Sequence, residues 1–461
     1  MGGIQADINT IHLEKVFNLD MNFGLNIYLK REIGKMLDLL IGLSAPAELS
    51  GTLIEKVTSG EDIRLINLDI VRKNYHELKK AFPYAVSYTA VKANSAEGIL
   101  ELLNEEGASF EIATIEELRK SIKRGISPER IIFSHPAKDA IEIAESFKIG
   151  VNRFASDSQE DIALIAKHAP GSKVMVRIKT SHEDKNHNSL TGFNERFGVT
   201  PAAATNLLRS LKSLGLEPYG VSFHVGTQEE DVNAWDWAIM RAASIFKELK
   251  NEGTELEVLD IGGGFPSRYK SKIPALSEYG EAIHRSINKH FSGALPQKII
   301  IEPGRAISAM AGITFGRVIN VKPCEHDDSR YIVTLSTGKF SAGLFNVGNG
   351  MFFYRKTSSG KMKNLSGASS KKADIHGKGG ASFDRPIEGD DICMPGDLKS
   401  GDIVIFTGTG AYSGEMTTNW CAKSPPRTIT LSNNAEMEPL LHNTLSAESP
   451  TDETAPSPAL A

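Results

Sequence analysis

Between residues 85 and 304, short runs rich in apolar and β-branched residues alternate with longer amphipathic segments. The segments 114–125, 158–169 and 234–253 repeat their apolar positions every three to four residues, which is typical of helices covering a core. The strand-like runs are 85–93, 108–114, 130–136, 151–156, 173–179, 218–226, 256–264 and 298–304. Eight such runs predict an α/β fold, a (β/α)8 TIM barrel covering about 65–310. A doubly wound open sheet is the alternative, and the count of eight favours the barrel.

The pattern changes after about residue 311. Strand-like runs with few helical segments between them predict a β-rich domain over 311–435, of a barrel-like or sandwich-like kind. These runs are 312–323, 330–340, 351–357 and 401–412. We expect a loop at 358–383, which is rich in Gly, Ser and Lys. Residues 1–60 form an N-terminal extension with a helix candidate at 26–43, and 436–461 predict a disordered tail because they hold too little apolar content to order themselves.

Composition narrows the class of protein. The formal net charge of −5 over 461 residues gives no electrostatic case for nucleic-acid binding. The three scattered cysteines build neither a disulfide framework nor a metal site. The longest apolar patch, 36–43, is too short to span a bilayer, and the N-terminus lacks the pattern of a signal peptide. We therefore expect a cytoplasmic protein without a metal, nucleic acid or membrane partner.

Ionisable residues gather where the predicted barrel strands end, which is where barrel enzymes place their sites. In chain order they are Lys92, Glu111, His135, Arg177, His224, Glu302 and Arg305. The triple glycine Gly262, Gly263 and Gly264 follows the seventh run, and Arg305 follows the eighth. Glycines let backbone N–H groups approach a phosphate and an arginine adds a cationic fork, so these two loops favour a phosphate site over a simple turn.

A phosphate site opposite a strand-end lysine suggests pyridoxal phosphate. The aldehyde of this cofactor needs an amine, for which Lys92 is the candidate, and its pyridine nitrogen needs an acid, for which Glu302 is the candidate. Taken singly, each residue has a structural interpretation as well. Lys92 can be a rim lysine that extends to solvent, Glu302 a partner of Arg305, and His224 a satisfied core histidine.

Six blocks in order carry a family resemblance. They are "YTAVKAN" (88–94), "RFGV" (196–199), "SFHVGTQ" (222–228), "LDIGGGFP" (259–266), "IEPGRA" (301–306) and "GAYS" (410–413). The chain resembles the fold type III, alanine-racemase-like pyridoxal-phosphate decarboxylases, and within them the ornithine and diaminopimelate decarboxylase group. The resemblance covers about 66–432.

This resemblance implies roles. Lys92 forms the Schiff base, His224 stacks on the pyridine ring, Glu302 pairs with the pyridine nitrogen, and Arg177 lies near the ring substituents. Gly262, Gly263, Gly264, Thr227, Arg305 and Tyr412 hold the phosphate, and Glu111 takes an acidic position beside the cofactor. Asp384 is implied to be catalytic and to contact the substrate. The resemblance further implies a homodimer with shared active sites.

Two departures concern the substrate. Where the family has a Cys-Asp pair, this sequence has Phe383 and Asp384, and where ornithine-type enzymes carry a further aspartate it has Gly348 and Asn349. A distal ammonium would lose an anionic partner there, so the main interpretation is a decarboxylase for a basic or modified diamino acid, conjugated substrates included, in polyamine or specialised metabolism. A silent homologue resembling antizyme inhibitors is an alternative, and so is an ordinary ornithine, lysine or diaminopimelate decarboxylase. The retained Lys92, Glu302 and Arg305 favour an enzyme.

Overall fold

The computed structural model describes residues 55–180, 196–269, 273–345, 350–359, 362–365, 370–387 and 392–432. The predicted helix at 26–43, the predicted tail and Asn349 lie outside the described residues. Among the described residues, no helix combines the length and the apolar character needed to cross a membrane.

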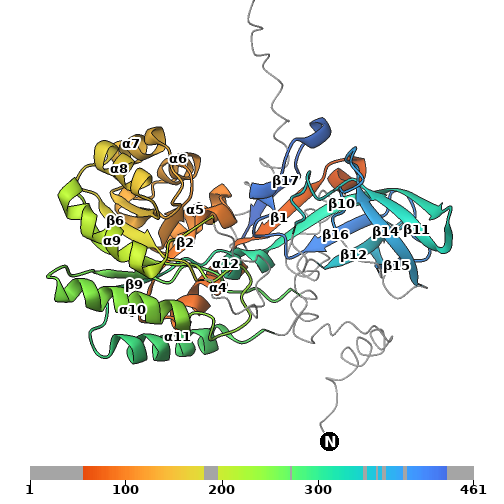
Figure 1. Ribbon diagram of the computed structural model, residues 1–461. Helices are drawn as coiled ribbons and strands as arrows, with labels where there is room; N and C mark the ends of the chain where they lie inside the picture. Colours follow the sequence, from red (N-terminus) through yellow and green to blue (C-terminus); the bar gives the residue numbers. More distant parts are fainter. Residues whose placement is uncertain are drawn as a thin grey trace, which may run out of the picture.

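Eight parallel strands close into a barrel in the order of the sequence (Figure 1). They are β2 (Val86–Ala90), β3 (Ser109–Ile112), β4 (Ile131–Phe133), β5 (Arg153–Ser156), β6 (Lys173–Arg177), β7 (Glu217–Ser222), β8 (Val258–Asp260) and β9 (Lys298–Ile301). Each strand coincides with one of the eight predicted runs, with β7 starting one residue before its run, and β9 pairs with β2 to complete the ring. The predicted barrel is confirmed, and the open-sheet alternative is wrong.

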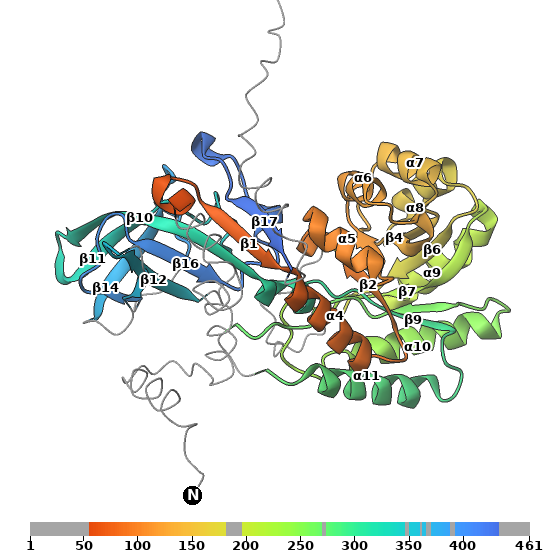
Figure 2. The ribbon, with the colours of Figure 1, turned by 180° about the vertical axis from the view of Figure 1, so that it is seen from behind.

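Amphipathic helices surround the barrel, as the views from both sides show (Figures 1 and 2). They are α4 (Leu68–Ala81), α5 (Glu97–Glu105), α6 (Ile115–Lys123), α7 (Ala140–Ile149), α8 (Gln159–His168), α9 (Pro201–Leu211), α10 (Asp236–Asn251) and α11 (Leu276–Phe291). Side-chain caps fix the first turns of α6 and α8: Thr114 accepts a hydrogen bond from the Glu117 N–H, and Ser158 from the Asp161 N–H. A short helix, α12 (Arg305–Ser308), follows β9.

The interior of the barrel is packed by side chains that point inward from the strands. One layer is apolar and consists of Tyr88, Ile132, Ala155, Met175, Tyr219, Val258 and Ile300. Side chains alternate along a strand, so residues two positions further along point the same way. From Met175, Val258 and Ile300, that step leads to Arg177, Asp260 and Glu302. The apolar layer therefore forms the floor of a charged layer at the carboxyl ends of the strands.

The second domain is a nine-stranded, mostly antiparallel sheet. Its strands are β1 (Ile63–Asn67), β10 (Gly312–Cys324), β11 (Asp327–Leu335), β12 (Met351–Lys356), β13 (Met362–Asn364), β14 (Ser370–Gly377), β15 (Cys393–Pro395), β16 (Ile403–Thr407) and β17 (Arg427–Leu431). Strand β1 precedes the barrel in sequence but pairs with β10 and β17 in this sheet, as Figure 1 shows. From β1 in the second domain, the chain therefore goes on to build the barrel and returns to the second domain at β10.

The prediction of a loop over 358–383 is wrong in part. Strands β13 and β14 lie there, and β14 pairs in parallel with β11. Ala373 and Ile375 alternate with polar residues and are buried. This alternation is a strand signal, but the surrounding Gly, Ser and Lys obscure it, and the long-range pairing with β11 stabilises the strand.

Candidate active site

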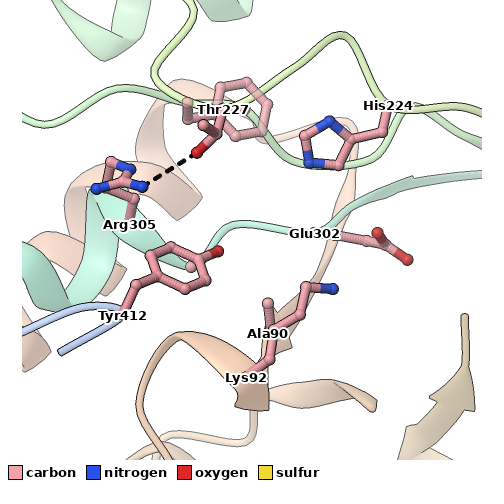
Figure 3. A pocket seen from close by; sticks show the side chains of 10 residues that line it. Ala90, Lys92, His224, Thr227, Glu302, Arg305 and Tyr412 are labelled. Atoms are coloured by element: carbon pink, nitrogen blue, oxygen red, sulfur yellow. Dashed lines mark hydrogen bonds between the residues drawn. The ribbon is translucent and has the colours of Figure 1, made fainter. Parts of the chain in front are cut away.

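A pocket opens at the carboxyl ends of the barrel strands (Figure 3). Its lining consists of Ala90, Lys92, His224, Thr227, Gly264, Phe265, Glu302, Gly304, Arg305 and Tyr412. Nine of these residues come from the barrel, while Tyr412 comes from the second domain. Tyr412 is fixed there by hydrogen bonds across the domain boundary: its N–H donates to the Ala93 carbonyl at 2.8 Å, and the Asn94 side chain donates to the Gly410 carbonyl at 2.7 Å.

Lys92 follows β2 in a single 3-10 turn, Val91–Ala93, and its side chain points into the pocket. Its Nζ donates a hydrogen bond of 2.6 Å to Oε2 of Glu111, which projects from β3 and is 1% exposed. Burial lowers the pKa of Lys92, but the charges of Glu111 and Glu302 outweigh burial and raise that pKa above its ordinary value. The lysine is therefore held as an ammonium, and Glu111 accepts its hydrogen bond.

Glu302 follows β9 and is 8% exposed. Burial raises its pKa, as does neighbouring Glu111, while Lys92 and Arg177 oppose the rise. Its Oε1 atom is buried and has no hydrogen-bond donor among the described residues. A buried carboxylate oxygen without a donor is costly, and a bound ligand with an N–H group would remove that cost.

His224 follows β7 and faces Glu302 and Lys92 across the pocket (Figure 3). Its Nδ1 accepts a hydrogen bond of 2.9 Å from the Gly226 N–H, so Nδ1 carries no proton. Burial, together with the charges of Arg177 and Lys92, lowers the pKa of His224 to about 3. A neutral imidazole with a fixed ring plane suits stacking on a flat cationic ring better than proton transfer.

The other end of the pocket is cationic and polar. Arg305 donates to the Thr227 hydroxyl at 3.2 Å and to the Tyr269 hydroxyl at 2.7 Å, and its guanidinium lies 4.8 Å from the centre of the Tyr412 ring. Figure 3 shows the Arg305–Thr227 contact. Arg305 is thus fixed in orientation, and its fork of N–H groups suits an oxyanion such as phosphate.

The triple glycine packs against the loops that follow β7 and β9. A Cβ atom at Gly263 would stand 2.5 Å from the Glu302 carbonyl, and one at Gly262 would stand 2.2 Å from the Phe223 carbonyl. Gly262 and Gly264 also have positive φ, 66° and 101°. Only glycine fits here, because the loops after β7, β8 and β9 meet backbone to backbone. The predicted glycine turn therefore brings three strand ends together at the pocket.

Arg177 ends β6, and its guanidinium lies 5.2 Å from the centre of the Phe197 ring. The His135 ring contacts the same phenylalanine edge-on, with 5.5 Å between ring centres. Burial lowers the pKa of His135 to about 4, with Lys92 adding to the effect. Neither Arg177 nor His135 lines the pocket itself, and both stand in the layer around it.

The structure does not bring Phe383 and Asp384 into this pocket. Asp384 is 1% exposed, and its carboxylate accepts hydrogen bonds from the Lys339 N–H at 2.6 Å and the Gly379 N–H at 2.9 Å. Phe383 is 60% exposed and packs edge-on against Phe340. Within one chain these residues therefore stabilise a loop of the second domain, and their predicted role at the substrate needs a second subunit.

In and around the pocket stand three residues that sequence reasoning did not single out. Asp260 ends β8 and is fully buried beside Glu302. Tyr269 orients Arg305, and Phe265 lines the wall. Asp260 and Phe265 flank the triple glycine in "LDIGGGFP", so proximity to that motif was the available signal. Tyr269 stands in a segment without a recognisable pattern, and no sequence signal pointed to it.

These features fit pyridoxal phosphate. The pocket has an amine at one end and a cation with a hydroxyl and a glycine loop at the other, and between them a neutral imidazole and a carboxylate oxygen that lacks a donor. Lys92 would hold the aldehyde carbon, Glu302 the pyridine nitrogen, His224 the ring face, and Arg305 with Thr227 the phosphate.

Comparison with known proteins gives the same result. Residues 68–309 match the family described as "Pyridoxal-dependent decarboxylase, pyridoxal binding domain". Lysine/ornithine decarboxylase of Selenomonas ruminantium is 30% identical over 359 residues, which cover 77% of this chain and 85% of that protein. Antizyme inhibitor 2 of Xenopus laevis is 33% identical over 261 residues, 57% of this chain and only 56% of that protein.

Solved structures agree with these relatives. The lysine/ornithine decarboxylase of Vibrio vulnificus, solved with cadaverine, superposes with a TM-score of 0.71 at 25% identity, and the match covers 84% of this chain and 99% of that one. The match therefore includes both the barrel and the second sheet of this chain. The predicted family is confirmed: this chain belongs to the pyridoxal-phosphate-dependent decarboxylases of the ornithine decarboxylase group.

Proposed function

We propose that this protein is a working decarboxylase that removes the α-carboxylate of a basic or modified diamino acid as CO2. The observation that carries the proposal is the set of four groups in one pocket: Lys92, His224, Glu302 and Arg305. When bound, pyridoxal phosphate supplies an aldehyde that captures the α-amine of the substrate and a ring that accepts the electron pair released by loss of CO2.

The protein side chains prepare and direct this chemistry. Glu111 accepts a hydrogen bond from the Lys92 ammonium, which fixes the direction of this side chain, and the amine becomes nucleophilic once it has lost a proton. Glu302 would pair with the pyridine nitrogen, and His224 would lie against the ring face. Arg305 and Thr227 would hold the phosphate. Loss of CO2 breaks the bond between Cα and the carboxylate carbon, and a proton from solvent takes the place of the carboxylate on Cα.

The distal end of the substrate is the more specific part of the proposal. Asp384, the acid that would meet a distal ammonium, is buried and accepts two backbone N–H groups of its own chain. Phe383, Phe340, Phe345 and Trp420 form an aromatic cluster beside it. These features favour a distal nitrogen that is conjugated or otherwise not a free ammonium.

We also propose a homodimer in which the second domain of one subunit approaches the site of the other. Phe383 and Trp420 are 60% and 47% exposed, and large exposed aromatics grouped in this way are typical of protein interfaces. Light scattering after gel filtration should give the mass of two chains. A single-chain mass at micromolar concentration would contradict the dimer.

The alternative is a homologue without catalytic activity, which the similarity to antizyme inhibitor 2 supports. A protein without catalysis has no need of a complete cofactor shell, and the pocket described here retains each of its parts. The deciding experiment is a CO2-release assay with ornithine, lysine, arginine, diaminopimelate and N-acylated diamino acids. Turnover of an acylated substrate supports the proposal, brisk turnover of free ornithine removes the substrate claim, and no turnover with no bound cofactor supports the silent homologue.

A further inference from the structure

Asp260 is a buried acid for which the proposed function has no role. It ends β8, and its side chain has no solvent exposure. Its Oδ1 accepts a hydrogen bond of 2.9 Å from the Gly262 N–H, while its Oδ2 has no N–H or O–H donor among the described residues. Burying a carboxylate oxygen without a donor is unfavourable, so an additional proton on this group would be stabilising.

Glu302 supplies the matching half of a pair. Strands β8 and β9 are neighbours with Asp260 opposite Ile300, and Glu302 lies two residues beyond Ile300, so both carboxyl groups project into the barrel from adjacent strands. They lie within hydrogen-bonding reach of each other. Oε1 of Glu302 and Oδ2 of Asp260 both lack donors, and one proton between the two carboxyl groups would remove the deficit of each.

The charges around the pair favour a proton there. Glu111, Asp260 and Glu302 are three buried carboxyl groups, and the nearby cations are Lys92 and Arg177. His224 is neutral and adds no charge. With one proton on the three carboxyl groups, two negative charges remain, which match the positive charges of Lys92 and Arg177. A buried cluster with an unbalanced charge would be far more costly.

The proton belongs on Asp260 rather than on Glu302. Burial raises the pKa of Asp260 well above its usual range, and the charge of Glu302 raises it further. Lys92 and Arg177 oppose the same rise at Glu302. Tyr88 on β2 and Lys298 on β9 also face Asp260. Lys298 stands two residues before Ile300, on the other side of the apolar layer from Glu302, where its ammonium donates to the Tyr88 hydroxyl at 2.7 Å. Lys298 therefore lies outside the charged layer that holds the pair.

We propose that Asp260 is a positioning residue that carries a proton at neutral pH and donates it to Glu302. The bond fixes the Glu302 carboxylate as the single anion facing the pocket and keeps it turned toward the place of the pyridine nitrogen. The link to the cofactor rests on the proposed function, whereas the shared proton is a property of the protein alone. Asp260 would then act on the reaction only through Glu302.

The test is the pH dependence of unfolding of the cofactor-free protein. Consider a group that holds a proton in the native state and releases it on unfolding. The free energy of unfolding then falls as the pH rises above the ordinary pKa of that group. We would measure the folding equilibrium constants of wild type and Asp260→Asn by urea unfolding at pH 5.5, 6.5 and 7.5. The ratio of the wild-type constant to the variant constant should fall by up to about tenfold per pH unit. The amide keeps the donor to Glu302 and carries no titrating proton. Equal slopes for the two proteins would overturn the proposal.

Asp402→Asn is the matched control. Asp402 is also a buried aspartate, 1% exposed, but it forms an ion pair with Arg355 at 2.7 Å. The control should be less stable by a constant factor at all three pH values, with the wild-type slope. If Asp260→Asn behaves in this way, Asp260 is an ionised structural residue and the proposal is wrong.

Two further variants keep the proposal testable. Should Asp260→Asn fail to fold, Glu302→Gln must show the same loss of slope, because it removes the anion that retains the proton. In the folded Asp260→Asn protein, pyridoxal-phosphate affinity should stay within about twofold of wild type, whereas Asp260→Ala should weaken it by about tenfold or more, a loss of about 1.4 kcal/mol. Equal affinities of the two variants would contradict the positioning role. Absence of cofactor binding by the wild type would refute the proposed function and leave the slope test standing.

Discussion

Replacement of Glu111 by glutamine should make Lys92 react faster with pyridoxal phosphate. The two side chains share a hydrogen bond of 2.6 Å, and Glu111 is 1% exposed, so its negative charge acts on the ammonium at short range. This charge is one cause of the raised pKa of Lys92. The neutral amide keeps the shape of the side chain and removes that charge.

The magnitude follows from the contact. A charge-assisted hydrogen bond contributes about 1.5–3 kcal/mol. Because the Lys92 side chain is 38% exposed, solvent screens part of the interaction, and we take the lower limit of about 1.5 kcal/mol. That energy corresponds to a fall of about one unit in the pKa of Lys92. Only the unprotonated amine attacks an aldehyde, so the reaction rate at a fixed neutral pH should rise by about tenfold.

The assay is the growth of the visible absorbance band when cofactor-free protein is mixed with excess pyridoxal phosphate, followed from pH 6 to 10. Because this range lies below the pKa of Lys92, the rate should be about tenfold higher in Glu111→Gln at each pH. Glu111→Asp, which keeps the charge, is the control and should stay near wild type. An unchanged rate, or a slower rate at every pH, would refute the role given to Glu111.

Three further predictions concern the loops and the core. In Gly263→Ala the new methyl group would stand 2.5 Å from the Glu302 carbonyl, so cofactor affinity measured by absorbance titration should fall by about tenfold or more, and an unaltered affinity would contradict the close loop packing. Burial and the charge of Glu111 raise the pKa of Glu117 to about 7, so the free energy of unfolding should fall by up to about 3 kcal/mol as pH rises from about 4.5 to about 7. Urea unfolding of Glu117→Gln should not show this fall. Identical pH profiles of the two proteins would argue against a buried proton on Glu117. Arg64 is 1% exposed and donates a hydrogen bond to the Ala342 carbonyl. Arg64→Met leaves that buried carbonyl without its donor and should lower the free energy of unfolding by about 2 kcal/mol, measured by urea unfolding. A stability equal to wild type would contradict this.

The barrel was predictable because its signals are local and repeated. Each strand is short and apolar, and seven of the eight are followed by an amphipathic helix, so this repeated pattern defines the ring without knowledge of any contact. The second domain was harder to predict. Strand β1 is separated from its partners β10 and β17 by the whole barrel, and β14 is stabilised by pairing with β11 rather than by its composition. Pairings over such distances leave little trace in the local sequence.

The candidate site divides in the same way. Lys92, His224, Glu302 and Arg305 stand at strand ends, where the fold itself predicts chemistry, and the structure brings them into one pocket. Phe383 and Asp384 were predicted from a motif alone, and their place in the second domain leaves their role dependent on a partner subunit. Asp260 was missed because an acid just before a glycine turn commonly accepts a hydrogen bond from the backbone of that turn. Its significance comes from Oε1 of Glu302, a buried oxygen without a donor among the described residues, which follows the adjacent strand.

The central claim is that Lys92 binds pyridoxal phosphate covalently, and borohydride reduction followed by peptide mapping tests it most directly. Wild-type protein incubated with the cofactor and reduced should carry one pyridoxyl group, located on Lys92 within the sequence "YTAVKAN". The Lys92→Ala protein should carry none. A label on a different lysine, or no label on well-folded wild-type protein, would contradict the account.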